Sequence, residues 1–166
     1  MTEVSDEVVV SVTRLYARQS RLIDEGDAPG WAATFADDGV FDSPSYPAPA
    51  VGTAALTAFA ADFHAGCVAG RTRLRHVVTN VDVLPGPDPD RVRARAYLQI
   101  VATPEGEASR LVRLTTLADD LVRTDGAWRV AHRRVRRDDT QPPDHPDHPD
   151  HPEQPEQPAD QQGASA

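Results

Sequence analysis

The chain has 166 residues, 39% of them hydrophobic, and a formal net charge of −9 at pH 7. Eight of the 26 acidic residues lie from Asp138 onward, which leaves 18 acidic against all 17 basic residues in 1–137. A nearly neutral body is a poor match for nucleic acid, whose binding needs clustered cations. No apolar run approaches the roughly 18 residues of a membrane-spanning helix, and the acidic N-terminus lacks the basic start of a signal peptide. We therefore expect a cytoplasmic protein that binds neither nucleic acid nor membrane.

Two kinds of covalent chemistry are disfavoured by the residue types present. All 17 basic residues are arginine, so no lysine is available to form a Schiff base. Cys67 is the single cysteine, which excludes an intramolecular disulfide. His64 is near enough in sequence to activate Cys67 as a nucleophile, but a small buried thiol near a helix end is the simpler interpretation.

The segment 138–166 has low complexity and differs from the rest of the chain. Asp-His-Pro occurs three times and Glu-Gln-Pro twice between residues 144 and 158. Proline at every third position favours an extended polyproline II helix, and the segment has little apolar surface to bury. Its histidines would recur with the period of that helix and could hold a transition metal, but a solvated tail is the simpler prediction. We expect a folded domain at 1–137 and a disordered tail at 138–166 without a catalytic role.

The helices are predicted in the first part of the chain. Residues 6–25 predict an amphipathic helix, with Ser5 as its N-cap and Gly26 at its end. Asp27 predicts the cap of a short second helix, and Gly52 begins a third. The predicted core-facing residues on these helices are Val8, Val12, Leu15, Tyr16, Gln19, Leu22, Ile23, Trp31, Phe35, Leu56, Phe59, Ala60 and Phe63.

The strands are predicted mainly in the second part. Residues 37–39 predict a turn, followed by a strand at 40–42 that breaks in a proline-rich loop. The apolar period then changes to two, which predicts strands at 74–84, 91–102, 110–123 and 128–136. Three helices followed by a strongly bent antiparallel sheet indicate an α+β fold. We expect a cone-shaped barrel of curved sheet covered by about three N-terminal helices, whose interior is a default ligand site.

His76 is the most informative candidate for chemistry. It is one of three histidines in residues 1–137, and the strand pattern places it on a sheet face. If a carboxylate from elsewhere in the chain contacts it, an imidazole at this place acts as a general base or acid near neutral pH.

The order of these elements, together with five short motifs, resembles the SnoaL-like branch of the nuclear-transport-factor-2-like superfamily. The motifs lie at residues 26–27, 35–42, 52–59, 73–80 and 125–133. The resemblance covers roughly residues 5–137 and implies the cone-shaped fold. Relatives include polyketide cyclases, ketosteroid isomerase, scytalone dehydratase, epoxide hydrolases, dioxygenase β subunits and proteins without catalysis, so the fold does not by itself supply a function.

Ketosteroid isomerase provides a first residue-level comparison. The position of its general-base aspartate corresponds to Ser43, and its oxyanion-hole tyrosine corresponds to Gln19. Its second oxyanion acid falls near Asp119 or Asp120. Because the base and one donor are missing, the resemblance argues against steroid-type isomerisation by that route.

Scytalone dehydratase is similar at the two positions that carry proton chemistry. Its catalytic aspartate matches Asp24, at the end of the first helix, and its catalytic histidine matches His76. Its substrate-orienting tyrosines correspond to Ile23 and Ser43, and its second histidine to Ala96. The resemblance therefore implies related proton chemistry on a different substrate.

The predicted pair suits chemistry without a metal or organic cofactor. If Asp24 accepts a hydrogen bond from one ring nitrogen of His76, it fixes the tautomer and leaves the other nitrogen as a base. Such a pair removes a proton next to a carbonyl or activates water. Otherwise Asp24 caps the helix or forms a salt bridge, and His76 is a hydrogen-bonded core residue.

The function predicted from the pair and the resemblance is a cofactor-independent dehydratase, cyclase or isomerase. Its substrate would be a small cyclic or polyketide-type metabolite of secondary metabolism. The alternatives are a non-catalytic binding or partner subunit with the same cavity, and an epoxide-type hydrolase.

Further residues are candidates for contact with the substrate. Asn80 follows His76 by four residues on the same predicted strand face, where it would bond to the substrate or to a neighbouring loop. Asp119 and Asp120 face opposite sides of one strand, so one can point inward, although a solvent-facing pair is the simpler interpretation. The candidate substrate-binding residues are Tyr16, Ser43, Asn80, Tyr97 and Asp119.

The remaining histidine and arginine residues are interpreted as structural. The three scattered histidines of residues 1–137 lack ligand spacing, so we expect no metal site. His132 and the tryptophans are interpreted as core residues, and the arginines of 129–137 as a sheet face or dimer contact. Family members commonly dimerise through the sheet, so the resemblance implies a homodimer.

Overall fold

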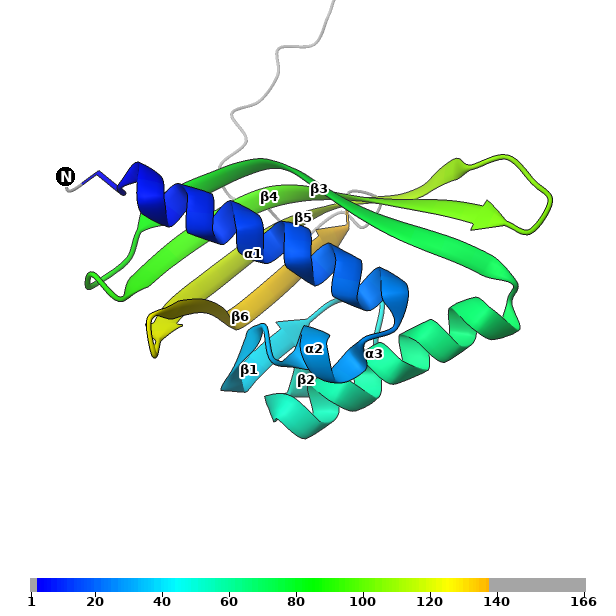
Figure 1. The fold of residues 1–166 in the computed structure, drawn as a ribbon, viewed down its shortest axis with the longest axis horizontal. Coiled ribbons are helices and arrows are strands. Elements are labelled where there is room, and N and C mark those ends of the chain that lie inside the picture. The colour runs from blue at the N-terminus through cyan, green and yellow to red at the C-terminus, as the bar shows by residue number, and fades with distance from the viewer. Residues whose placement is uncertain (1–2, 138–166) are drawn as a thin grey trace, which may run out of the picture.

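The computed structural model describes residues 3–137 and has three helices and one six-stranded sheet in that range (Figure 1). The elements are α1 (Asp6–Glu25), α2 (Ala28–Ala32), β1 (Phe35–Asp42), β2 (Ala50–Val51), α3 (Gly52–Ala69), β3 (Thr72–Pro85), β4 (Arg91–Pro104), β5 (Arg110–Thr124) and β6 (Ala127–Arg137). This arrangement confirms the predicted α+β fold. The predictions for 138–166 lie outside the described residues.

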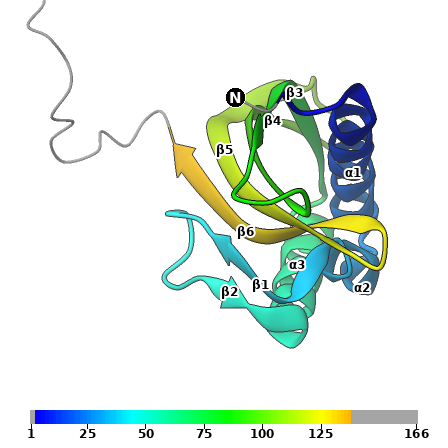
Figure 2. The same ribbon diagram turned by 90° about the vertical axis from the view of Figure 1, so that its left-hand side faces the viewer.

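The sheet curls strongly but is not closed into a barrel. Its strand order is β2-β1-β6-β5-β4-β3, so β2 and β3 form the two edges. Neighbouring strands are antiparallel except β1 and β6, which are parallel. The sheet curves into a half-cone, and α1 lies across its open side (Figure 2). The predicted cone shape with covering helices is confirmed, but the sheet is not the closed barrel that was predicted.

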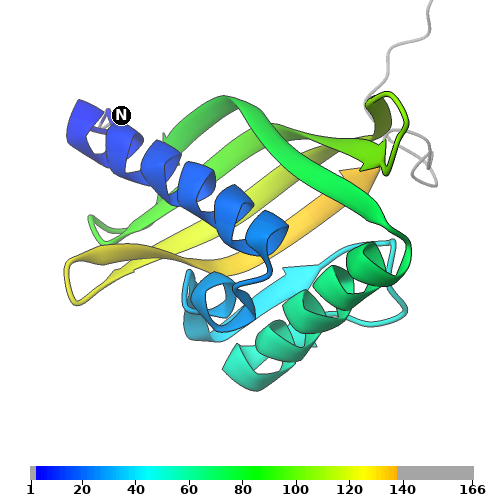
Figure 3. The same cartoon turned by 45° about the vertical axis from the view of Figure 1, so that its right-hand side comes forward.

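Helix α1 has the predicted bounds, and its buried stripe positions the site. Val12, Tyr16, Gln19 and Ile23 recur at helical spacing and face the sheet. Gly26 ends the helix in the left-handed conformation, with φ of 82°, where a side chain would be strained. The last turn of α1 lies over β3, and α3 packs against α2 and β1 (Figure 3).

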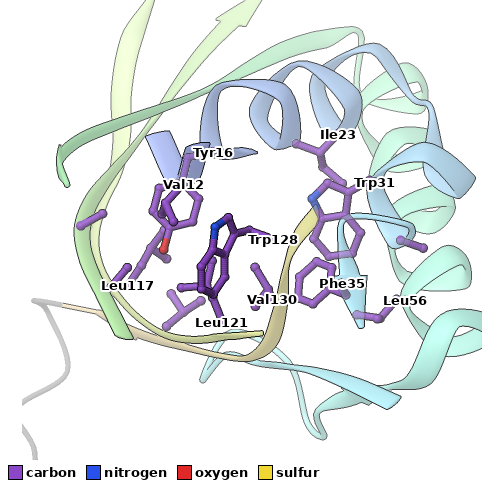
Figure 4. Close-up of a cluster of buried hydrophobic side chains, with 14 of the residues drawn as sticks. Val12, Tyr16, Ile23, Trp31, Phe35, Leu56, Leu117, Leu121, Trp128 and Val130 are labelled. Carbon is purple, nitrogen blue, oxygen red and sulfur yellow. The ribbon is translucent and has the colours of Figure 1, made fainter. Parts of the chain in front are cut away.

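Both tryptophans lie in the core, as predicted. Trp31 and Trp128 are 4% and 8% exposed, and both belong to the buried hydrophobic cluster (Figure 4). Trp31 packs on Phe35 with ring centroids 4.8 Å apart and on Phe59 at 5.5 Å. Tilted aromatic pairs at these distances contribute about 0.5–1.5 kcal/mol each beyond their buried area. They fix α2 and α3 against the start of the sheet.

The predicted turn at 37–39 is wrong, because these residues belong to β1. The strand begins at Phe35, and its pairing with β6 is irregular between Phe35 and Val40. A Cβ on Gly39 would lie 2.8 Å from the Ala36 carbonyl oxygen, so only glycine fits this close approach. The Asp-Asp-Gly sequence is therefore a strand irregularity rather than a chain reversal.

The outer face of the sheet presents apolar side chains. Val77 and Leu114 are exposed, and both are cross-strand neighbours of Gln99. The homodimer through the sheet stays a prediction. Among residues 3–137, no helix has the length and apolar character needed to cross a membrane.

Candidate active site

A cavity lies between α1, α3 and the concave face of the sheet. It contains about 710 Å³ of free space, part of which is open to solvent. Most of its wall is apolar, with a few polar groups at defined places, which is typical of small-molecule sites. Its lining residues are Gln19, Ser20, Ile23, Trp31, Phe41, Ser43, Ser45, Tyr46, Phe59, Phe63, His76, Val78, Leu98, Ile100, Arg113, Thr115, Leu117, Arg133 and Val135.

Asp24 and His76 are brought together where the last turn of α1 meets β3. Asp24 Oδ1 lies 2.7 Å from His76 Nδ1, and Asp24 Oδ2 accepts the backbone N–H of His76 at 3.1 Å. The side chains are 6% and 14% exposed. His76 borders the cavity, and the Phe63 ring packs beside it at 5.4 Å between centroids.

The contact with Asp24 assigns different tasks to the two ring nitrogens of His76. An ionised carboxylate only accepts hydrogen bonds, so Nδ1 carries the ring proton in this contact. In the neutral ring, Nε2 is then left with the lone pair. Because Asp24 accepts from both the ring and the backbone of His76, the ring is held in one orientation. Chemically, such a ring can take a proton from a group in the cavity.

Arg113 lies in the same cross-strand row as His76 but was not among the predicted site residues. Ile100 on β4 pairs with His76 on one side and with Arg113 on the other. All three border the cavity, and two strand spacings amount to about 9–10 Å. No carboxylate of the described range 3–137 forms an ion pair with Arg113. Arg113 lies four residues before the inward-facing Leu117 on β5, so the two-residue period of a strand indicates that Arg113 also faces inward.

A second buried cluster joins α1 to β5 and β6. The Tyr16 hydroxyl donates to Asp119 Oδ2 at 2.7 Å. Arg133 donates to the same carboxylate through Nε at 3.0 Å and Nη2 at 2.6 Å. Burial, and then the negative charge of Asp119, raises the pKa of Tyr16 well above its ordinary value. Tyr16 is therefore a neutral donor in this cluster.

This cluster corrects two of the predicted substrate-binding residues. Asp119 does point inward, but it is occupied by Tyr16 and Arg133, and neither Tyr16 nor Asp119 borders the cavity. Asp120 faces the other side and pairs with Arg134 at 2.9 Å. The prediction that the arginines of β6 form only a sheet face or dimer contact is wrong for Arg133, which is 6% exposed.

The other three predicted substrate-binding residues lie in different environments. Ser43 is buried and borders the cavity. Asn80 is exposed because a bulge between Thr79 and Asp82 breaks the alternation of β3, and its φ is 54°. Tyr97 is 50% exposed, since it alternates outward between inward neighbours on β4. Asn80 and Tyr97 are thus away from the cavity.

Groups that would bind a metal are not gathered in the described part of the chain. Residues 3–137 contain no cluster of three or more histidine, cysteine, aspartate or glutamate side chains suited to an ion. Burial, followed by the charge of Asp24, raises the pKa of the Cys67 thiol. A raised thiol pKa lowers the thiolate fraction and argues against a nucleophilic cysteine.

Comparison with known proteins identifies a matching family and several similar solved structures. The SnoaL-like domain family matches residues 6–134. The structure of Aln2 from a Streptomyces species is 30% identical, with a TM-score of 0.74, over 83% of this chain and 96% of that chain. ActVI-ORFA from Streptomyces coelicolor is 26% identical, with a TM-score of 0.76, over 83% and 100%.

A third similar structure contains a bound compound. This protein from Catenulispora acidiphila, solved in complex with S-DNPA, is 28% identical with a TM-score of 0.71 over 81% of this chain and 96% of that chain. A search of curated proteins finds no match. The family match spans α1 to β6 and includes every cavity-lining residue except Val135, and the chain belongs to the SnoaL-like domain family.

Proposed function

We propose that the chain is a cofactor-independent acid–base enzyme, a dehydratase, cyclase or isomerase, for a small cyclic or polyketide-type metabolite. The observation that carries the proposal is the 2.7 Å contact between Asp24 Oδ1 and His76 Nδ1 at the wall of a largely apolar cavity. The resemblance to polyketide cyclases supports the substrate class. Membership in a family that includes enzymes supports the reaction type without identifying the reaction.

The first step of the proposed reaction is proton removal. His76 Nε2 takes a proton from a carbon next to a carbonyl, and the electron pair moves to the carbonyl oxygen as an enolate. Asp24 keeps the proton on Nδ1 and stabilises the imidazolium that forms. General base catalysis of this kind contributes about 10²–10⁴-fold.

Arg113 supplies the charge that an enolate requires. It borders the same cavity in the same cross-strand row as His76 and has no carboxylate partner among the described residues. A fixed positive group in a partly dry site stabilises negative charge that develops in the transition state. We therefore assign the enolate oxygen to the Arg113 side of the cavity.

The fate of the proton on His76 distinguishes the three reactions. If His76 gives the proton to a hydroxyl that departs from the β carbon, water leaves and a double bond forms between the α and β carbons. If His76 gives the proton to a different carbon, the product is an isomer of the substrate. If the enolate carbon attacks a second carbonyl, the proton goes to the new alkoxide and a ring closes.

The test compares turnover of candidate substrates by the wild type, His76→Ala and Asp24→Asn. We expect both variants to lose about 10²–10⁴-fold in rate while their circular dichroism spectra stay native. His64→Ala is the matched control, because His64 lies against Gly26 outside the cavity. Its rate should equal that of the wild type.

The outcomes of this test separate the proposal from its rivals. Unchanged turnover in both His76→Ala and Asp24→Asn would remove the catalytic proposal and leave a binding subunit. A product that has gained water, rather than lost it, would indicate that His76 activates water, as in an epoxide-type hydrolase.

A further inference from the structure

Gln19 has a buried acceptor without a partner at the cavity wall. Its Nε2 donates to Thr34 Oγ1 at 2.7 Å, and Thr34 Oγ1 donates to the Trp31 carbonyl at 2.6 Å. A hydroxyl has one proton, and that of Thr34 is used, so Thr34 can only accept from Gln19. The network therefore fixes the amide orientation and leaves Oε1 as the free atom.

The unpaired oxygen is unusual for a residue buried to this degree. Gln19 is 3% exposed, and its Oε1 has no hydrogen-bond partner within the described chain. Buried polar atoms are nearly always paired, because an unpaired acceptor destabilises the folded protein. Since Gln19 borders the cavity, a ligand in the cavity is in a position to provide the missing donor.

Arg133 offers a donor on the wall of the same cavity. Its Nε and Nη2 are taken by Asp119, which leaves Nη1 outside that contact. The guanidinium lies 5.9 Å from the Phe35 ring, next in sequence to the Thr34 that binds Gln19. Arg133 also borders the cavity. Gln19 with an unpaired acceptor and Arg133 with a spare donor therefore both border the same cavity.

The charge around Gln19 and Arg133 determines which polar group of a ligand fits there. Asp119 neutralises Arg133 through a buried ion pair at 2.6 Å, and Tyr16 adds no charge. A carboxylate would gain little from a neutralised arginine and would face the Gln19 oxygen, which repels it. A hydroxyl is a neutral group whose single oxygen both donates and accepts a hydrogen bond.

We propose that the Gln19 and Arg133 end of the cavity binds a hydroxyl group of the substrate. The phenol or alcohol donates to Gln19 Oε1 and accepts from Arg133 Nη1, which orients the ring that carries it. The inference deepens the proposed function and rests on it in one respect, because it takes this cavity as the substrate site. The substrate class is then a hydroxylated cyclic compound.

The experiment measures the affinity of the folded protein for three probes by calorimetry: 2-naphthol, 2-methoxynaphthalene and naphthalene. The ring is shared, and only 2-naphthol can donate to Gln19. We expect the wild type to bind 2-naphthol about tenfold more tightly than either other probe, the size expected for one buried hydrogen bond.

Gln19→Met tests the residue itself. The substitution keeps the side-chain length and removes the acceptor. The affinity of the variant for 2-naphthol should therefore be about equal to its affinity for the other two probes. Its unfolding midpoint should be close to that of the wild type, because the lost bond to Thr34 is offset by removal of an unpaired oxygen. Ser20→Ala is the matched control: Ser20 is the next residue of α1 and also borders the cavity, and the preference should persist.

Several results would overturn the inference. They are equal affinity of the wild type for the three probes, no binding of 2-naphthol, or a tenfold preference that survives Gln19→Met. The comparison of the three probes on the wild type tests the inference even if Gln19→Met does not fold. His76→Ala should keep the preference, so loss of turnover in that variant tests the proposed function, and loss of the hydroxyl preference tests the cavity end.

Discussion

Asp24 and Asp119 are both buried carboxylates in contact with a basic side chain, and the nature of that base separates them. Asp119 is completely buried against Arg133, with a contact of 2.6 Å. Asp24 lies 2.7 Å from His76, whose ring is slightly exposed at the cavity, and only 3.9 Å from Nη1 of the half-exposed Arg75. Arginine stays protonated under all ordinary conditions, whereas histidine exchanges its proton near neutral pH.

The comparison teaches that similar geometry serves two purposes. A carboxylate that is buried against a permanent cation, and also accepts from Tyr16, holds α1 to the sheet. A carboxylate that faces an imidazole at a cavity wall controls where a proton sits. If this distinction is right, the Asp119 cluster determines stability, and the Asp24 pair determines rate.

The largest expected effect on stability comes from Arg133→Met. This change leaves the charge of Asp119 buried and unpaired, so the free energy of unfolding should fall by about 3–5 kcal/mol. Urea denaturation measures it. The double variant Arg133→Met with Asp119→Leu should recover most of the loss, because replacing both partners removes the unpaired charge.

Arg134→Met is the matched control on the same strand. Arg134 pairs with Asp120 at 2.9 Å, and both side chains are nearly half exposed. Exposed pairs contribute about 0–1 kcal/mol, so this variant should be close to the wild type. Equal losses for the two arginines would show that burial does not distinguish the pairs.

Tyr16→Phe is the next largest expected effect. The change removes a hydroxyl that donates to the Asp119 carboxylate at 2.7 Å. Hydrogen bonds to charged groups contribute about 1.5–3 kcal/mol, and we expect a loss of unfolding free energy in that range. A loss near zero would mean that Arg133 alone satisfies the carboxylate.

The same tyrosine predicts a loss of stability in alkali. Burial, followed by the charge of Asp119, raises the pKa of Tyr16, so above about pH 10 the unfolded chain releases this proton before the folded chain does. The contribution is fully present below about pH 10 and is lost as the pH rises further. Urea midpoints from pH 8 to 11 should fall less steeply in Tyr16→Phe. Parallel profiles would contradict this assignment.

Local patterns in the sequence indicate where Asp24 and His76 lie, but not that they pair. Helical spacing places Asp24 at the end of α1, strand alternation places His76 on the inner face of β3, and the resemblance supplies their pairing. The strand alternation fails at Asn80, because a bulge adds a residue that no hydrophobic pattern indicates. The strand alternation correctly indicates that Tyr97 faces outward. The prediction that Tyr97 contacts the substrate therefore went against the alternation.

The second cluster depends on information that local patterns lack. Asp119 and Arg133 become partners because β5 and β6 pair in a register that sets them directly opposite each other. That register depends on an irregularity between Asp120 and Leu121. A run of arginines looks solvated in sequence, and only the register selects the one that is buried.

Asp24→Asn should have a smaller effect on stability than the changes above. The amide keeps its shape and can still accept from the backbone N–H of His76, so the loss should be about 1 kcal/mol. Asp119→Asn is the matched substitution and should cost more, because it leaves Arg133 buried without its counter-charge. Thermal or urea unfolding of both variants makes the comparison, and a larger loss at Asp24 would assign it a mainly structural role.

The smallest expected effect is on the reactivity of Cys67. Burial and then the charge of Asp24 raise the pKa of this thiol, so less thiolate is present at pH 8 than in a free cysteine, and alkylation by iodoacetamide should be slower. Asp24→Asn removes one of the two causes and should speed alkylation, while Asp119→Asn should leave the rate unchanged. Mass spectrometry follows the reaction. If Asp24→Asn leaves the alkylation rate unchanged, Asp24 carries no effective negative charge in the folded protein. The base proposed at His76 would then lack the counter-ion that stabilises its imidazolium.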